Sequence, residues 1–141
     1  MPIQHYDVII IGAGQAGNPL SVAMARAGLK TALVEREHVG GTCLNDGCTP
    51  TKTMVASARV AYLARRAADY GVGTGPIAID MRRVRQRKRD IVDSFRSGSE
   101  RRIRETPNLE LLAATARFTG ARTLDARTAG GATRSCAAEW I

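Results

Sequence analysis

The segment YDVIIIGAGQAG, residues 6–17, constrains the fold of this chain more than any other part. Val8–Ile11 are apolar at every position, as in a strand that is buried on both faces of a parallel sheet. Three glycines with the spacing G-x-G-x-x-G follow at once: Gly12, Gly14 and Gly17. A helical pattern then runs from Gly14 to Ala27, and the stretch KTALVE, residues 30–35, predicts a second strand. This order of strand, glycine turn, helix and strand predicts a right-handed βαβ unit.

The glycine turn and Glu35 together form a dinucleotide-binding fingerprint. Gly12 permits a tight turn, Gly14 lets the backbone approach a pyrophosphate, and Gly17 allows the helix to pack closely on the strand. The amino end of the helix offers unpaired N–H groups to the phosphates, while Glu35 can accept hydrogen bonds from ribose hydroxyls. A glycine-rich turn beside a surface glutamate is the simpler alternative. The fingerprint alone does not distinguish NAD from FAD.

Residues 40–52, GGTCLNDGCTPTK, contain two cysteines five positions apart, Cys43 and Cys48. In a regular helix, Cα atoms at that spacing lie about 8–9 Å apart, whereas a disulfide requires less than about 7 Å. A disulfide here therefore requires an irregular backbone, which the intervening Asn45–Gly47 tolerate. Because so short a loop stabilises a fold only slightly, reversible chemistry is the better reason for the pair.

The sequence also indicates which sulfur is the more reactive. Residues 50–69 predict a helix with Thr49 as its N-cap, so Cys48 is expected just before the helix and near the cation of Lys52. Both the helix field and that cation favour a thiolate at Cys48. The spacing does not match a C-x₂-C zinc site, and no metal site is expected, because the other candidate ligands form no motif: His5, His38 and Cys136. A pair of inert buried thiols remains an alternative.

A basic segment follows. The formal net charge is +8, and its excess is concentrated in residues 82–104. The pattern predicts a helix from Met81 to Glu105 with an apolar stripe of Met81, Val84, Ile91, Val92, Phe95 and Ile103. Such charge runs usually face water, and the segment lacks a series of aromatic residues that could stack bases. A solvated helix face is therefore favoured, and no nucleic-acid partner is expected.

The last third of the chain predicts three short strands, LELLAATARF (109–118), RTLDAR (122–127) and ATRSCAAEWI (132–141). Cys136 in the last of them has no evident role. No apolar run approaches the roughly 18–20 residues of a membrane span, and the first residues do not resemble a signal peptide. We therefore expect a cytoplasmic protein without a membrane partner, in which a cysteine pair is more often catalytic than structural.

The glycine and cysteine segments together resemble those of the class I pyridine nucleotide–disulfide oxidoreductases. These flavoenzymes include dihydrolipoyl dehydrogenase, glutathione reductase and mercuric reductase, and the similarity extends over roughly residues 5–128. The stretches CTPTKTMVASA and ARRAADYGV look most like the mercuric reductase-like and dihydrolipoyl dehydrogenase-like branches. The resemblance implies an α/β fold: the N-terminal part of a Rossmann-like FAD-binding domain, with a parallel sheet, flanking helices and a short antiparallel β segment.

The resemblance also implies roles for individual residues. Cys43 would be the interchange thiol that reacts with substrate, Cys48 the charge-transfer thiol beside the flavin, and Lys52 a cation near the flavin N5. Gly12, Gly14 and Gly17 would hold the FAD pyrophosphate, as in the fingerprint. The adenosine would contact Glu35 and Ala116, and the phosphate and ribityl region Gly41 and Thr42. The implied cofactor-binding set is thus Gly12, Gly14, Gly17, Glu35, Gly41, Thr42, Lys52 and Ala116.

By the same resemblance, residues 1–141 are expected to form a partial, truncated FAD-binding domain. Complete members add NAD(P)H-binding and dimerisation domains and act as homodimers. The expected function is to pass electrons from NAD(P)H through FAD to the cysteine pair, and on to a disulfide or metal-ion substrate. The alternative is a non-catalytic remnant that binds FAD weakly or not at all.

Overall fold

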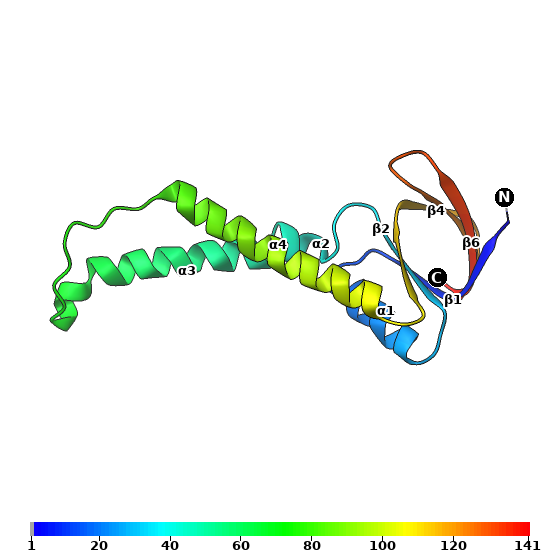
Figure 1. Ribbon diagram of the computed structural model, residues 1–141, viewed down its shortest axis with the longest axis horizontal. Coiled ribbons are helices and arrows are strands. Elements are labelled where there is room, and N and C mark those ends of the chain that lie inside the picture. Colours follow the sequence, from blue (N-terminus) through cyan, green and yellow to red (C-terminus); the bar gives the residue numbers. More distant parts are fainter. Residues whose placement is uncertain (1) are drawn as a thin grey trace.

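The structure, a computed structural model, describes residues 2–141 as a mixed sheet from which a long helical hairpin projects (Figure 1). Its elements are β1 (Gln4–Ile11), α1 (Gly17–Arg26), β2 (Thr31–Glu35), α2 (Gly41–Asn45), α3 (Cys48–Arg65), η1 (Ala67–Tyr70), α4 (Met81–Glu105), β3 (Leu109–Ala113), β4 (Thr115–Gly120), β5 (Thr123–Arg127) and β6 (Thr133–Trp140). Most of these elements were predicted from the sequence. Helix α2 is the one helix within residues 2–141 that was not.

The six strands form one sheet in the order β3-β2-β1-β6-β5-β4. The first four of these strands are parallel, and β5 runs antiparallel to both of its neighbours, β6 and β4. Strand β6 belongs to both parts, because Cys136 pairs with Gln4 of β1 on one side and with Leu124 of β5 on the other. The predicted α/β class, with a parallel sheet and a short antiparallel segment, is confirmed.

Both faces of the parallel strands are buried, as the continuous apolar run in β1 predicts. Ile9 and Val34 lie in the core on one face, whereas Leu33 packs on the other with Ile103 of α4. Cys136 is also a core residue, with 1% of its surface exposed, and this burial raises the pKa of its thiol. The residue without an evident role in the sequence thus contributes to packing between the strands.

The bounds of two helices differ from the prediction. Helix α1 begins at Gly17, three residues later than expected, because residues 14–16 form a turn. Helix α3 begins at Cys48, with Gly47 in place of Thr49 at the N-cap, and ends at Arg65, before a short 3₁₀ turn. Pro50 is therefore the third helical residue, a position it tolerates because first-turn N–H groups have no intrahelical acceptor.

The prediction of one strand over residues 109–118 was wrong in detail. The segment divides at Ala114 into β3, which pairs in parallel with β2, and β4, which pairs antiparallel with β5. The N–H of Ala114 donates to the carbonyl of Glu35 (2.9 Å), so the chain turns away beside the end of β2. This turn brings the start of β4 next to the glycine turn.

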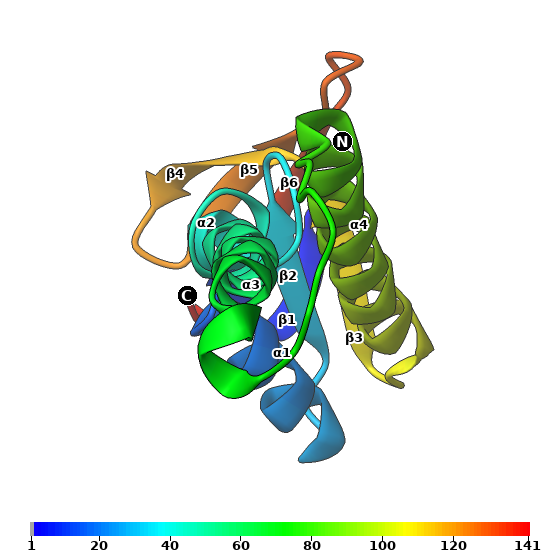
Figure 2. The same ribbon diagram turned by 90° about the vertical axis from the view of Figure 1, so that its left-hand side faces the viewer.

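Helices α3 and α4 run antiparallel and extend beyond the sheet (Figures 1 and 2). The predicted bounds of α4 are confirmed, and Asp80 caps its amino end by accepting from the N–H groups of Arg82 and Arg83. The predicted apolar stripe is only partly covered: Val92 and Ile103 are buried, whereas Met81 and Phe95 are more than half exposed. Within residues 2–141, no helix is long and apolar enough to cross a membrane.

Candidate functional site

The glycine turn has the geometry that its sequence requires. Gly12 has a φ of 96°, a left-handed conformation that favours glycine, and its N–H donates to the Val34 carbonyl at 2.7 Å. A Cβ atom on Gly17 would lie 1.9 Å from the Gly12 carbonyl oxygen, so the first turn of α1 sits directly on β1. The tight turn and the close packing predicted for these two glycines are present.

Glu35, at the end of β2, holds this turn in place. One carboxylate oxygen accepts from the N–H of Ala13 (2.8 Å) and the other from the N–H of Glu37 (2.8 Å). The sequence did not reveal these bonds. Each carboxylate oxygen still has a lone pair available for another donor. Glu35 can therefore both fix the turn and bind a ligand hydroxyl.

A cleft of about 250 Å³ lies beside Glu35. It is lined by residues from the ends of β1 and β2 and from the start of β4, including Gly12, Glu35 and Ala116. These three were predicted to contact the dinucleotide, and they come from distant parts of the sequence. The structure brings them together around one cleft, which suits an adenosine group.

The cysteine segment begins against the glycine turn. The N–H of Gly40 donates to the carbonyl of Ala13 at 2.7 Å. Gly41 has a φ of 58°, and a Cβ atom on it would lie 2.8 Å from the Cα of Gly14. The two motifs are therefore in backbone contact, at a point where Gly41 could not carry a side chain without displacing Gly14.

Cys43 and Cys48 lie on different helices. Cys43 is in α2 and Cys48 is the first residue of α3, so Cys48 lies inside the helix and not before it as expected. Between the helices, the N–H groups of Asp46 and Gly47 both donate to the carbonyl of Thr42, at 2.9 and 2.7 Å. This is the irregular backbone that the spacing required. Both cysteines are free thiols in the structure.

The two thiols interact. A hydrogen bond with the Cys48 side chain is the main cause of a raised pKa at Cys43, and the nearby Lys52 cation opposes the shift only weakly. The two sulfurs therefore influence each other directly. The assignment of Cys48 as the thiolate stays a prediction.

The thiols open into a cleft of about 560 Å³ between α3 and α4. Lys52 and Arg87 contribute the basic groups of its lining, Ile91 and Phe95 contribute apolar surface, and no acidic residue lines it. The three predicted catalytic residues, Cys43, Cys48 and Lys52, are thus together. Thr42 does not line this cleft, and its side chain is exposed. Its contact with the cofactor stays a prediction.

We predict that Cys48→Ala lowers the pKa of Cys43, because the hydrogen bond that raises it is lost. At pH 8 a larger fraction of Cys43 would then be thiolate, and its alkylation by iodoacetamide would be faster than in the unaltered protein. The pH profile of alkylation, read peptide by peptide by mass spectrometry, measures the shift. An unchanged or slower rate would show that the two sulfurs do not interact.

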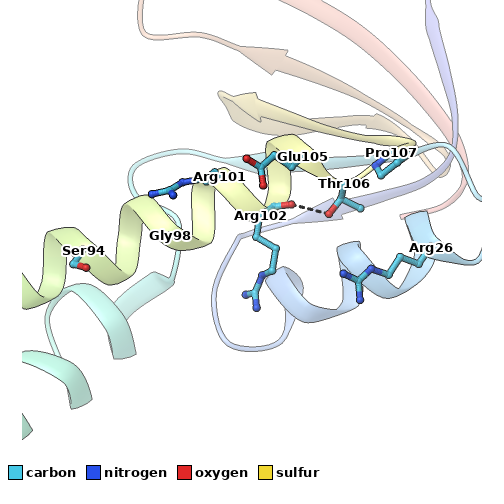
Figure 3. Close-up of a pocket in the computed structure, with 8 residues that line it drawn as sticks. All are labelled: Arg26, Ser94, Gly98, Arg101, Arg102, Glu105, Thr106 and Pro107. Atoms are coloured by element: carbon cyan, nitrogen blue, oxygen red, sulfur yellow. Dashed lines mark hydrogen bonds between the residues drawn. The ribbon is translucent and has the colours of Figure 1, made fainter.

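A second groove, of about 510 Å³, lies between α1 and the end of α4 (Figure 3). The side chains of Arg26 and Arg102 extend into it, and Thr106 donates to the Arg102 carbonyl at its floor. Its lining contains no cysteine and none of the predicted site residues. The cysteine cleft, not this groove, is the candidate redox site.

In this α/β domain, the segment that bears the two cysteines packs against the glycine turn. That combination is typical of one class of redox proteins. A profile described as pyridine nucleotide-disulphide oxidoreductase matches residues 6–140. The chain belongs to this family, whose members depend on FAD and NAD(P)H.

Individual relatives agree with this assignment. The chain is 44% identical over 94 residues to a dihydrolipoyl dehydrogenase of Bacillus subtilis (67% of the chain, 20% of the relative), and 42% identical over 101 residues to one of Chlamydia muridarum (72% and 22%). The structure resembles the Cu(II) complex of the HOCl-induced flavoprotein disulfide reductase RclA from Escherichia coli. The TM-score is 0.76 at 30% identity, covering 99% of this chain and 27% of that one. The chain thus spans about a fifth to a quarter of these proteins.

The described residues fit an FAD molecule. The cleft at Glu35 includes Gly12 and the cysteine cleft includes Gln15, so both clefts adjoin the glycine turn. Helix α1 begins without a side-chain cap and without an acid in its first turn. Pro19 has no N–H, and the N–H groups of Asn18 and Leu20 donate to the carbonyls of Gly14 and Ala16, so the N–H of Gly17 is the one that the start of the helix offers to a phosphate. The contacts of the implied site residues with FAD stay predictions.

Proposed function

We propose that this chain supplies the FAD-binding and dithiol parts of an NAD(P)H-dependent flavin disulfide oxidoreductase. The observation that carries the proposal is the backbone contact between Gly14 and Gly41, because it joins the dinucleotide-binding turn to the segment that bears both cysteines. Family membership supports it independently. A mercuric reductase-like substrate finds no support among the relatives described above and stays a prediction.

In this proposal, Gly12, Gly14 and Gly17 hold the pyrophosphate of FAD. Glu35 and Ala116 hold the adenosine, Gly41 and Thr42 contact the phosphate and ribityl groups, and Lys52 faces the reactive end of the cofactor. Bound FAD would carry two electrons between NAD(P)H and the dithiol. The chain itself contributes the backbone approach, the helix N-terminus and the cation that favours a negative charge nearby.

The two thiols would reduce a disulfide substrate by exchange. The Cys43 proton passes to the Cys48 thiolate through their hydrogen bond, and the Cys43 thiolate attacks one substrate sulfur, releasing the first substrate thiolate. That thiolate takes the proton from Cys48, which then attacks the Cys43 sulfur and releases the second substrate thiolate, protonated from water. The products are two substrate thiols and a Cys43–Cys48 disulfide, so atoms and electrons balance.

A metal ion is the second substrate class that we propose for the same pair. Its support is the flavoprotein disulfide reductase RclA, for which one solved structure is a Cu(II) complex. Thiolates bind soft metal ions, and the cleft is open to solvent at Cys48, an exposed residue. We further propose that the complete enzyme is a cytoplasmic homodimer. In the cytoplasm thiols are kept reduced and disulfides are usually transient and catalytic, as proposed for this pair.

The test is FAD binding by the chain. Titration with FAD to about millimolar concentration, followed by flavin fluorescence and by competition with ADP, should give saturable binding. Glu35→Gln should weaken binding about tenfold, since a hydrogen bond to a charged acceptor contributes about 1.5–3 kcal/mol. Glu139→Gln, the same exchange at an exposed residue of β6, should leave it unchanged. Absence of any FAD or ADP binding would refute the proposal and favour a non-catalytic protein.

A further inference from the structure

Helix α4 forms side-chain hydrogen bonds to each of the two helices that carry the cysteines, in each case from one arginine. Arg96 donates through Nε to Oδ1 of Asn45 (2.8 Å), and Asn45 lies on α2, two residues after Cys43. Arg87 donates through Nη1 to the carbonyl of Thr53 (3.1 Å), one turn into α3 from Cys48. One rigid helix thus holds both helices.

The contact at Asn45 is fixed on both sides. The Asn45 amide group donates to the carbonyls of Val39 (3.1 Å) and Gly41 (2.9 Å), so its oxygen points at α4. Arg96 is in turn held by Asp93, one helical turn earlier, at 3.3 Å, and its side chain is only 25% exposed. A guanidinium oriented by a carboxylate and partly shielded from water is a well-defined anchor.

The contact at Thr53 lies on the opposite side of the helix break. Arg87 also approaches the hydroxyl of Ser57 (3.5 Å), one turn further along α3, and its side chain lines the cysteine cleft. Nine residues separate the two arginines, about 13 Å along a helix at 1.5 Å per residue. Helix α4 therefore spans the break at Asp46–Gly47, where the backbone is irregular and the two helices could otherwise move apart.

We propose that Arg96 and Arg87 are positioning residues that hold the Cys43 and Cys48 sulfurs at bonding distance and so set the stability of their disulfide. The inference rests on the proposed redox function of this pair. Without either arginine, one of the two helices is freer, the effective concentration of one thiol at the other falls, and the disulfide becomes easier to reduce. Neither arginine needs to contact the cofactor or the substrate.

The test is oxidation of the 141-residue chain by glutathione disulfide. One protein dithiol and one glutathione disulfide give one protein disulfide and two glutathione thiols. Acid quenching, alkylation and peptide mass spectrometry then measure the equilibrium constant and separate this pair from Cys136. We expect Arg96→Met and Arg87→Met each to lower the constant about tenfold, which corresponds to a reduction potential about 30 mV less negative.

Three variants sharpen the test. Arg96→Lys keeps a cation near Asp93 and Asn45 and should stay within about threefold of the unaltered protein. Arg89→Met removes an arginine of α4 that makes no hydrogen bond or ion pair within residues 2–141, and should change nothing. The double variant should shift the constant by less than the product of the single effects, because a sulfur pair already released on one side gains little from the other anchor.

The outcomes separate the two proposals. If the unaltered protein forms the Cys43–Cys48 disulfide but Arg96→Met and Arg87→Met match Arg89→Met, the positioning role is wrong and the redox function stands. The same conclusion follows if these variants lose thermal stability without a change in the constant, since that is a purely structural effect. If the unaltered protein forms no such disulfide at any glutathione ratio, the redox function itself is wrong. Should Arg96→Met fail to fold, Arg87→Met and Arg96→Lys decide the question.

Discussion

Gly17→Ala should lower the free energy of unfolding by more than about 3 kcal/mol, the size of a severe overpacking defect. The added Cβ would lie 1.9 Å from the carbonyl oxygen of Gly12, well inside van der Waals contact. That carbonyl cannot easily move, because the N–H of Gly12 is bonded to Val34 and β1 lies between two strands. Helix α1 would have to move away from the sheet, and the dinucleotide-binding turn would be lost with it.

Gly98→Ala is the matched control, in the opposite direction. Gly98 lies inside α4, and a Cβ atom there meets no other atom within 4 Å. Alanine should therefore stabilise the protein by about 1 kcal/mol through its higher helix propensity. Urea denaturation followed by circular dichroism measures both changes. Equal stability of the two variants would contradict the close packing of α1 on β1.

Cys48→Ser should abolish thiolate-to-flavin charge-transfer absorbance in the FAD-loaded, reduced protein. Our proposal gives Cys48 the negative charge because Cys48 begins α3 and lies at the same cleft as the Lys52 cation. A serine hydroxyl does not ionise near neutral pH, so no charged donor remains at that position. Absorbance beyond the main flavin bands, recorded after reduction with a small dithiol and removal of excess reductant, measures the effect.

Cys43→Ser is the control for that experiment. It removes the other thiol but leaves Cys48, so the long-wavelength band should persist while the disulfide can no longer form. If the band instead disappears in Cys43→Ser and survives in Cys48→Ser, the roles of the two sulfurs are reversed. Intact-mass analysis after alkylation confirms independently which thiol is present in each sample.

The elements that could be predicted from the sequence are those whose own residues carry a clear pattern of apolar positions or end signals. The apolar run Val8–Ile11 predicted a buried strand; Val8 and Ile9 are buried, whereas Ile11 at the end of β1 is half exposed. The predicted bounds of α4 agree with the structure because Asp80 and Pro107 mark its two ends. The division at Ala114 was missed, since β3 and β4 share one alternation and only their partners differ. Helix α2 was missed because glycine and asparagine are poor helix formers.

The site was predicted in the same uneven way. Spacing and residue type placed Cys43, Cys48 and Lys52 together, and the structure has them around one cleft. The bonds from Arg87 and Arg96 could not be predicted, because they depend on the angle at which α4 crosses α2 and α3 and not on any local pattern. In the sequence, these two residues are indistinguishable from the other arginines of a basic helix.

Strand β6 has a consequence for how the protein is made. Cys136 in β6, near one end of the described chain, pairs with Gln4 in β1, near the other end. During translation, β1 therefore leaves the ribosome long before β6, its neighbour in the sheet, has been synthesised. Until then, one edge of an apolar strand is open to pairing with other molecules. Final closure of the sheet must therefore wait until residues 133–140 have been synthesised, and chaperones that shield exposed edges would act on the nascent polypeptide during that interval.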